Sequence, residues 1–376
     1  MTGWLCFTGW QSAITGIGFL VAGIIQGLII LNNESYIPHQ WHVTLLIIAV
    51  VSFCVLVNIF VARRLPIVEG CLAILHFTGI FVVIIILWTL APRNNGHDAF
   101  LKLNNGGGWS SDGLSFMVGL YPLTLCLLGF DSQVHMCMFS AGILSAGIVV
   151  TLIFTLGDLD DLVASPTGWP FLQLFYNTTK SYAGTDVMAL LLILPLTGSV
   201  IACVATASRQ IWAFARDNGV PFSSTIAHIS PKSSIPLNAI FISLIVCVLL
   251  SLIEIGSTAA LNAILALDLA ALLCSYTISI GCIALRRIRG PPLPPREWSL
   301  GKFGLAINIC ALIWLIPMFV FTLFPSVTPV TAAGMNYGVL LFGFVVVFST
   351  GYYLVIGKNA YISPRERLRR DLQGEL

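Results

Sequence analysis

A ten-residue stretch, Leu127 to Met136, places an aspartate and a histidine inside an apolar run of the chain. Asp131 and His135 are four residues apart, so they share one helix face if the helix resumes after Gly129. A carboxylate there can neutralise a cationic solute, and a carboxylate with a histidine can carry protons. The alternative is a structural aspartate that bonds a neighbouring helix, with His135 near an interface.

The apolar surroundings give these two groups their importance. Of 376 residues, 57% are hydrophobic and only 9% are charged. Soluble domains carry about 25% charged residues, so this composition predicts a membrane protein. A charge near the middle of a bilayer costs about 3 kcal/mol or more, so such residues usually face a cavity and mark a substrate or ion path. The net charge of +2 gives no reason to expect nucleic-acid binding.

Three further residues are candidates for the same cavity. Asp268 is a second acid within an apolar run, and it either lines the cavity or pairs with Asn262. Trp10 and Gln11 begin the first apolar run and could face the cavity, although Trp10 could instead be an interfacial anchor. The sequence has no phosphate-binding glycine loop, nucleophile motif or Cys/His cluster with ligand spacing, so we expect no enzyme activity, metal or cofactor.

Ten apolar segments, forming one membrane domain over residues 1–357, must position these residues. A crossing needs about 20 residues of helix. The block 113–157 is too long for one crossing, so we expect a division near 139–142. The expected spans are 11–31, 43–62, 67–90, 113–136, 140–157, 187–207, 237–256, 258–285, 304–324 and 332–356.

Basic residues indicate how these spans are oriented. With the N-terminus inside, 15 of the 18 Lys and Arg residues fall on the inner side, including a basic tail at 358–376. The exceptions are Arg93, Lys102 and Lys180. The positive-inside rule therefore predicts that both termini are cytoplasmic. Two glycosylation sequons, at Asn33 and Asn177, fall in outer loops, and Asn177 is the preferred acceptor because Asn33 adjoins the membrane; chance matches are the alternative.

Several motifs together resemble a known family. They are Ser208 to Asp217, Ile235 to Ala239, Trp298 to Gly304, Gly129 to Asp131, and His135-Met136. These segments resemble the fungal choline/GABA/amino-acid permease branch of the amino acid–polyamine–organocation (APC) transporter superfamily. The resemblance covers nearly all of the chain.

The resemblance implies an all-helical bundle of inverted repeats, with substrate bound at mid-membrane between the family's broken first and sixth helices. On that map Gly129 and Phe130 supply unwound backbone and an aromatic lid, and Asp131 lies at the break. The resemblance also implies gating ion pairs at the inner end of the eighth helix. That region holds Arg209, Arg216 and Asp217.

The ten spans match the family's third to twelfth helices, so we expect a bundle without the first two. The loop that the family has after His135-Met136 is also shortened. We expect a secondary transporter of amino acids or related amines (GABA, choline, polyamine) that works by alternating access coupled to protons. Its partners are then the solute and the lipid bilayer, in the plasma membrane or the vacuolar membrane. The alternative is a remnant or accessory membrane protein without transport.

Overall fold

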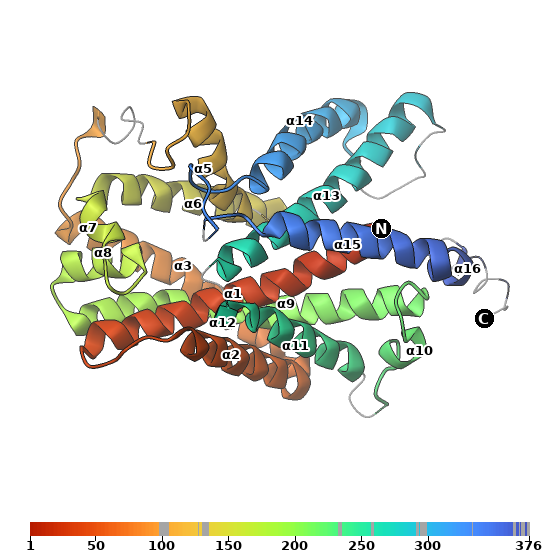
Figure 1. The fold of residues 1–376 in the computed structure, drawn as a ribbon, viewed down its shortest axis with the longest axis horizontal. Coiled ribbons are helices and arrows are strands. Elements are labelled where there is room, and N and C mark those ends of the chain that lie inside the picture. Colours follow the sequence, from red (N-terminus) through yellow and green to blue (C-terminus); the bar gives the residue numbers. More distant parts are fainter. Residues whose placement is uncertain are drawn as a thin grey trace.

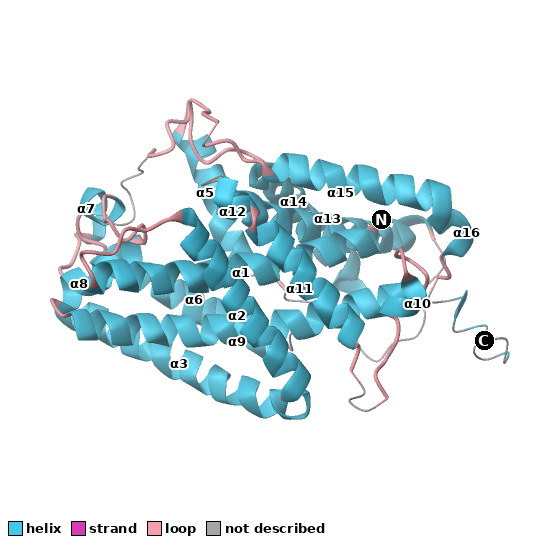
Figure 2. Ribbon diagram, turned by 60° about the horizontal axis from the view of Figure 1, so that its bottom comes forward, coloured by secondary structure: helices cyan, strands magenta, loops and turns pink. Residues whose placement is uncertain are grey.

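The computed structural model describes residues 1–97, 105–126, 128–129, 135–231, 235–256, 259–290, 293, 299–332, 334–363, 366–367, 369 and 373, with only the backbone described for 135–139. All regular structure in these residues is helical (Figure 1, Figure 2). The long helices are α1 (Thr2–Asn32), α2 (Gln40–Phe60), α3 (Leu65–Leu90), α5 (Asp112–Cys126), α6 (His135–Thr155), α9 (Tyr182–Arg216), α11 (Leu237–Ser251), α13 (Ala260–Arg289), α14 (Gly304–Thr322) and α15 (Gly338–Tyr352). The short ones are η1 (Ala62–Arg64), α7 (Leu159–Val163), α8 (Pro170–Thr179), α10 (Ser223–Ile226), α12 (Ile253–Gly256), η3 (Gly301–Phe303), η4 (Tyr353–Gly357) and α16 (Lys358–Ala360).

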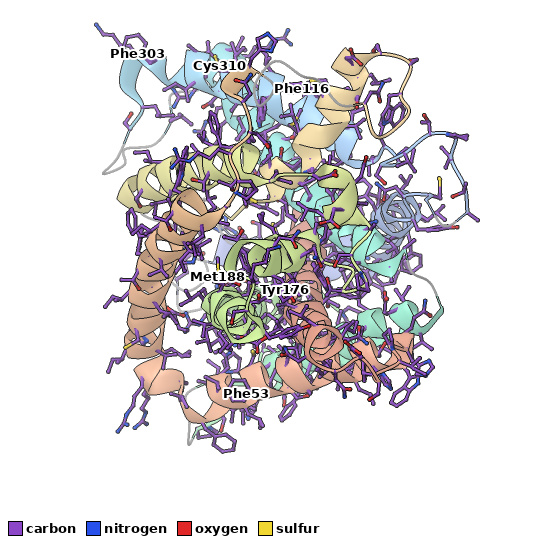
Figure 3. All side chains as sticks on the ribbon, turned by 90° about the vertical axis from the view of Figure 1, so that its left-hand side faces the viewer. Phe53, Phe116, Tyr176, Met188, Phe303 and Cys310 are labelled. Atoms are coloured by element: carbon purple, nitrogen blue, oxygen red, sulfur yellow. The ribbon has the colours of Figure 1, made fainter. Side chains whose placement is uncertain are left out.

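The helices confirm the all-helical, polytopic membrane architecture expected from the sequence. Within the described residues, eight helical segments are long and apolar enough to cross a bilayer. Large apolar side chains such as Phe53, Phe116 and Phe303 point outward from the bundle, whereas Met188 lies between helices (Figure 3). Lipid accepts such a surface because the helices satisfy their own backbone hydrogen bonds.

The structure corrects the division expected at 139–142. α5 already ends at Cys126, and α6 runs without interruption from His135 to Thr155. Between them Gly129 has φ +82°, a left-handed conformation that a right-handed helix does not contain. The break therefore depends on the backbone at Gly129, two residues before Asp131, and the small residues at 140–142 continue a helix.

α1 is the central helix of the bundle. It crosses the middle of Figure 1 and packs against α13, α9, α2 and α11. It approaches α13 closely at two glycines: a Cβ on Gly9 would lie 2.6 Å from Leu272 Cγ, and one on Gly16 would lie 2.7 Å from Leu265 Cδ2. Small residues permit such close contact between membrane helices. The two pairs run in opposite directions along the chain, so α1 and α13 are antiparallel.

We expect Gly9→Ala to destabilise the protein by about 1–3 kcal/mol, because the new methyl overpacks the contact with Leu272. Gly70 on α3 is the matched control, since a Cβ there meets no atom within 4 Å. Gly70→Ala should be neutral or raise stability by about 0.5–1 kcal/mol through helix propensity. Thermal unfolding in detergent measures both. Equal effects of the two variants would contradict the close approach of α1 and α13.

The N-terminus lies with α10, α16 and Tyr361 at one end of the bundle, toward the right of Figure 1. We call this the terminal end. α7 and α8 cover the opposite end, which we call the α8 end.

Candidate functional site

Asp268 is a buried acid within a membrane-spanning helix. It lies on α13, is 4% exposed, and its Oδ1 has no hydrogen-bond partner among the described residues. A buried polar group without a partner costs about 1–3 kcal/mol, and a charged one costs more. Such a carboxylate is well suited to bind a cation or a proton that the described residues do not supply.

One face of α13 turns this carboxylate toward α1. The residues of that face are spaced by three, four and three positions; they are Leu265, Asp268, Leu272 and Ser275. Ser275 Oγ lies 3.0 Å from Cys6 Sγ, which continues the antiparallel register set at Gly9 and Gly16. In this register each step forward on α1 is matched by one step back on α13. Asp268 therefore lies opposite Ala13, whose methyl group offers it no hydrogen bond.

Ser12 adds a second unpartnered polar group at this level. Its side chain is fully buried, and its Oγ has no partner in the part of the chain that the structure describes. Serine in a helix commonly bonds a carbonyl of the preceding turn, as Thr15 Oγ1 does to Gln11 O at 3.0 Å. Sequence reasoning missed Ser12 because no local pattern distinguishes a serine that makes this bond from one that does not.

Trp10 and Gly129 come together beside the same helix face. A Cβ on Gly129 would lie 3.5 Å from Cη2 of Trp10. Trp10 is 8% exposed and belongs to a core cluster with Leu272. This burial excludes an interfacial-anchor role for Trp10. The structure therefore gathers Trp10, Gly129 and Asp268 around one part of α1.

Three predicted site residues are not placed by the structure. Phe130 and Asp131 lie outside the described residues, and His135 begins α6 with its side chain undescribed. Their assignment to the site stays a prediction.

Gln11 is turned away from Asp268. At about 100° per residue, it lies on the side of α1 opposite to Gly9 and Ala13. Its Nε2 donates a 2.9 Å hydrogen bond to Ser243 Oγ on α11. The structure therefore gives Gln11 a position between α1 and α11, away from the cavity for which the sequence proposed it.

The predicted gating residues lie at the terminal end. Asp217 Oδ1 lies 3.2 Å from Arg367 Nη1 and 3.7 Å from Arg216 Nε. The Ile362 amide also donates to the Asp217 carbonyl oxygen at 3.0 Å. Arg209 is exposed on α9 and makes no ion pair within the described residues. The structure brings Asp217 to the C-terminal tail, a contact that the sequence did not predict.

Asn177, the preferred glycosylation acceptor, lies at the last turns of α8. Its Nδ2 donates to Asp161 Oδ2 at 2.9 Å, and its Oδ1 accepts from Gln173 Nε2 at 3.1 Å. A glycan on Nδ2 would compete with the contact to Asp161. Glycosylation of Asn177 stays a prediction.

A cavity elsewhere in the bundle does not include Asp268. It has a volume of about 600 Å³ between α1, α3 and α9, and its lining is mainly apolar. Glu69 and His76 of α3 contribute polar groups to it, but neither Asp268 nor Ser12 lines it. The unpartnered polar atoms, and not the cavity volume, therefore locate the candidate site.

Comparison with known sequences identifies the kind of protein that carries this site. The sequence profile of the family described as "Amino acid permease" matches residues 1–346. The chain belongs to the amino acid permease family. The permease is thus an integral membrane protein of a transporter family and not an enzyme, and the APC resemblance is confirmed.

Three curated relatives of the permease are each 28% identical to it. An amino-acid permease of Schizosaccharomyces pombe matches over 397 residues, covering 100% of this chain and 72% of the relative. The choline transporter of Saccharomyces cerevisiae matches over 368 residues, covering 92% and 64%. The polyamine transporter TPO5 of Saccharomyces cerevisiae matches over 394 residues, covering 96% and 63%. The permease chain spans about two thirds of the length of these relatives.

Proposed function

We propose that the permease carries a small amine-bearing solute across a membrane by alternating access, coupled to protons. The observation that carries this proposal is the buried Asp268 carboxylate on the face of α13 toward α1, whose Oδ1 has no hydrogen-bond partner among the residues that the structure describes. Two relatives are named for choline and polyamine, and a cationic nitrogen is what these solutes share. A carboxylate in a water-excluded site neutralises such a nitrogen.

Neighbouring groups favour a cation at this place. Ser12 Oγ can accept a hydrogen bond from an ammonium N–H, and the indole of Trp10 provides an aromatic surface. α5 ends at Cys126, close to the Gly129 turn that contacts Trp10. The carboxyl end of a helix carries partial negative charge, and broken membrane helices use it to attract cations.

Coupling and orientation follow from the same chemistry. Asp268 would bind either the amine or a proton, so that release of the solute on the inner side is linked to proton transfer. In our proposal the terminal end faces the cytoplasm and the α8 end faces outward, as the distribution of basic residues predicts. The membrane is then the plasma membrane or the vacuolar membrane.

Uptake of radiolabelled choline, GABA, spermidine and a neutral amino acid into permease-deficient yeast tests this function. We expect at least one solute to enter several times faster than in cells with empty vector, and a protonophore to abolish the difference. Solute-induced shifts in the unfolding temperature of the purified protein give an independent reading. If no solute enters and none shifts the unfolding temperature, the alternative of a non-transporting membrane protein holds.

A further inference from the structure

A separate cavity lies between α5, α13, α14 and the loops before α5 and after α14. Its volume is about 500 Å³. Four aromatic side chains line it; they are Trp109, Tyr121, Phe321 and Phe324. No charged side chain occurs among its described lining residues. Aromatic faces attract organic cations, and a lining without cationic groups does not repel them.

Three of the four rings contact one another in series and form one wall of the cavity. The ring centroids of Trp109 and Phe324 are 5.9 Å apart, and those of Phe321 and Phe324 are 5.3 Å apart. The indole Nε1 of Trp109 is buried and has no hydrogen-bond partner within the described residues. A buried indole N–H usually has an acceptor, so this donor is available to a hydroxyl or carboxylate of a bound solute.

Hydrogen bonds between loops hold the rim of this cavity in place. Asn105 accepts from the Trp109 amide at 3.0 Å and donates to the Trp109 carbonyl at 2.6 Å, which closes the loop before α5. The Thr328 amide donates to the Gly107 carbonyl at 2.7 Å and joins this loop to the one after α14. Asn336 Nδ2 donates to two carbonyls at the end of α14, at 2.8 and 3.0 Å. A preformed cavity of this kind binds with little ordering cost.

Tyr121 connects the lining of this cavity with the part of α13 that carries Asp268. Tyr121 comes nine residues after the start of α5 and Asp268 eight residues after the start of α13, so both lie about 12–14 Å into their helices. Tyr121 packs against the core cluster that contains Leu273 and Leu269, the residue that follows Asp268 in α13. Asn262 lines the cavity about 9 Å nearer than Asp268 to the start of α13, which the proposed orientation places on the outer side.

We propose that this cavity is an outer capture site for alkylated ammonium cations, held against Trp109 and Phe324 before they pass Tyr121 to Asp268. The described lining offers no carboxylate to replace the hydration of N–H groups, so a quaternary nitrogen suits the cavity better than a primary amine. This inference rests on the proposed function for its place in transport, but the binding itself can be measured without transport.

The test measures equilibrium binding of radiolabelled tetramethylammonium to the purified full chain carrying Asp268→Asn, which disables the central site. We expect Trp109→Leu to weaken binding about tenfold, and Trp109→Phe, which keeps an aromatic ring, to weaken it less than threefold. Trp41→Leu is the matched control, since Trp41 is exposed at the start of α2 and does not line the cavity. In the chain with Asp268 intact, Trp109→Leu should raise KM for choline uptake about tenfold and leave the maximal rate unchanged.

The outcomes separate this inference from the proposed function. Binding that Trp109→Leu leaves unchanged overturns the capture site, even if uptake is normal. If the chain binds choline and its uncharged analogue 3,3-dimethylbutanol with equal affinity, the claim that the site selects cations is overturned. Binding that depends on Trp109 in a chain that transports nothing supports the capture site and contradicts the proposed function. If Trp109→Leu fails to fold, Phe324→Leu removes the neighbouring ring and tests the same wall.

Discussion

Asp268→Asn is expected to reduce amine uptake at least thirtyfold while the protein still folds. The amide keeps the shape of the carboxylate but removes the charge that neutralises a cation in a water-excluded site. Loss of such a contact costs about 2 kcal/mol or more, which corresponds to about thirtyfold. The measurement is the initial rate of radiolabelled uptake at equal amounts of membrane-inserted protein, together with the unfolding temperature in detergent.

Two companion variants make this result specific. Asp160→Asn removes an exposed acid from α7 and should leave uptake unchanged. Ser12→Ala removes the acceptor proposed for an ammonium N–H, and a hydrogen bond to a charged group is worth about 1.5–3 kcal/mol, so uptake should fall at least about tenfold. Wild-type uptake by Asp268→Asn would show that the carboxylate does not hold the solute. Residual uptake that no longer responds to a proton gradient would support proton coupling at Asp268.

Hydropathy predicts the crossing helices because lipid leaves the backbone few alternatives. A segment in the bilayer must satisfy its own hydrogen bonds, so an apolar run of about 20 residues predicts a helix almost regardless of its other features. The division of the block 113–157 is different, because it depends on one backbone conformation. Residues 140–142 resemble a turn by composition but are helical, whereas Gly129 adopts a left-handed φ that a continuous helix does not contain.

The site is harder to predict because it depends on helix register. Asp268 is visible in the sequence as an acid in an apolar run, but its direction is set by contacts with α1. Cys6 and Ser275, which share one of these contacts, are 269 residues apart in the chain. The same register brings Ser12 near Asp268 and turns Gln11 toward Ser243. No local pattern encodes a register between helices so distant in sequence.

Arg367→Glu is expected to detach the C-terminal arm, by which we mean the described tail residues 361–363, 366, 367 and 369. Arg367 pairs with the largely buried Asp217, and a glutamate there would place two carboxylates together. The contact also includes the Ile362 amide on the Asp217 carbonyl and the Tyr361 ring 6.3 Å from that of Phe214. We expect amide hydrogen exchange at Ile362 to accelerate at least tenfold.

Tyr361 is not expected to make this contact sensitive to physiological pH. Burial, and then the Asp217 carboxylate, raise the pKa of the Tyr361 phenol above its ordinary value of 10.0. The phenol is therefore neutral well above physiological pH. Between pH 6 and 8, the rate of hydrogen exchange at the Ile362 amide of the wild-type protein should then rise only as much as the intrinsic exchange rate of an unprotected amide does.

Arg369→Glu is the matched control for Arg367→Glu, because Arg369 pairs with Glu366 of the arm itself, at 2.7 Å, and not with the bundle. Arg369→Glu should leave amide hydrogen exchange at Ile362 unchanged. The double variant Asp217→Arg with Arg367→Asp, which reverses the two charges, should restore much of the protection of the Ile362 amide. Equal acceleration in both single variants would indicate a general charge effect and contradict a specific pair.

Asp217 caps α9, and α9 packs along α1, the helix that carries Ser12. Detaching the arm should therefore change the rate of transport more than the affinity for the solute, since it frees the C-terminal end of α9 and leaves Asp268 in place.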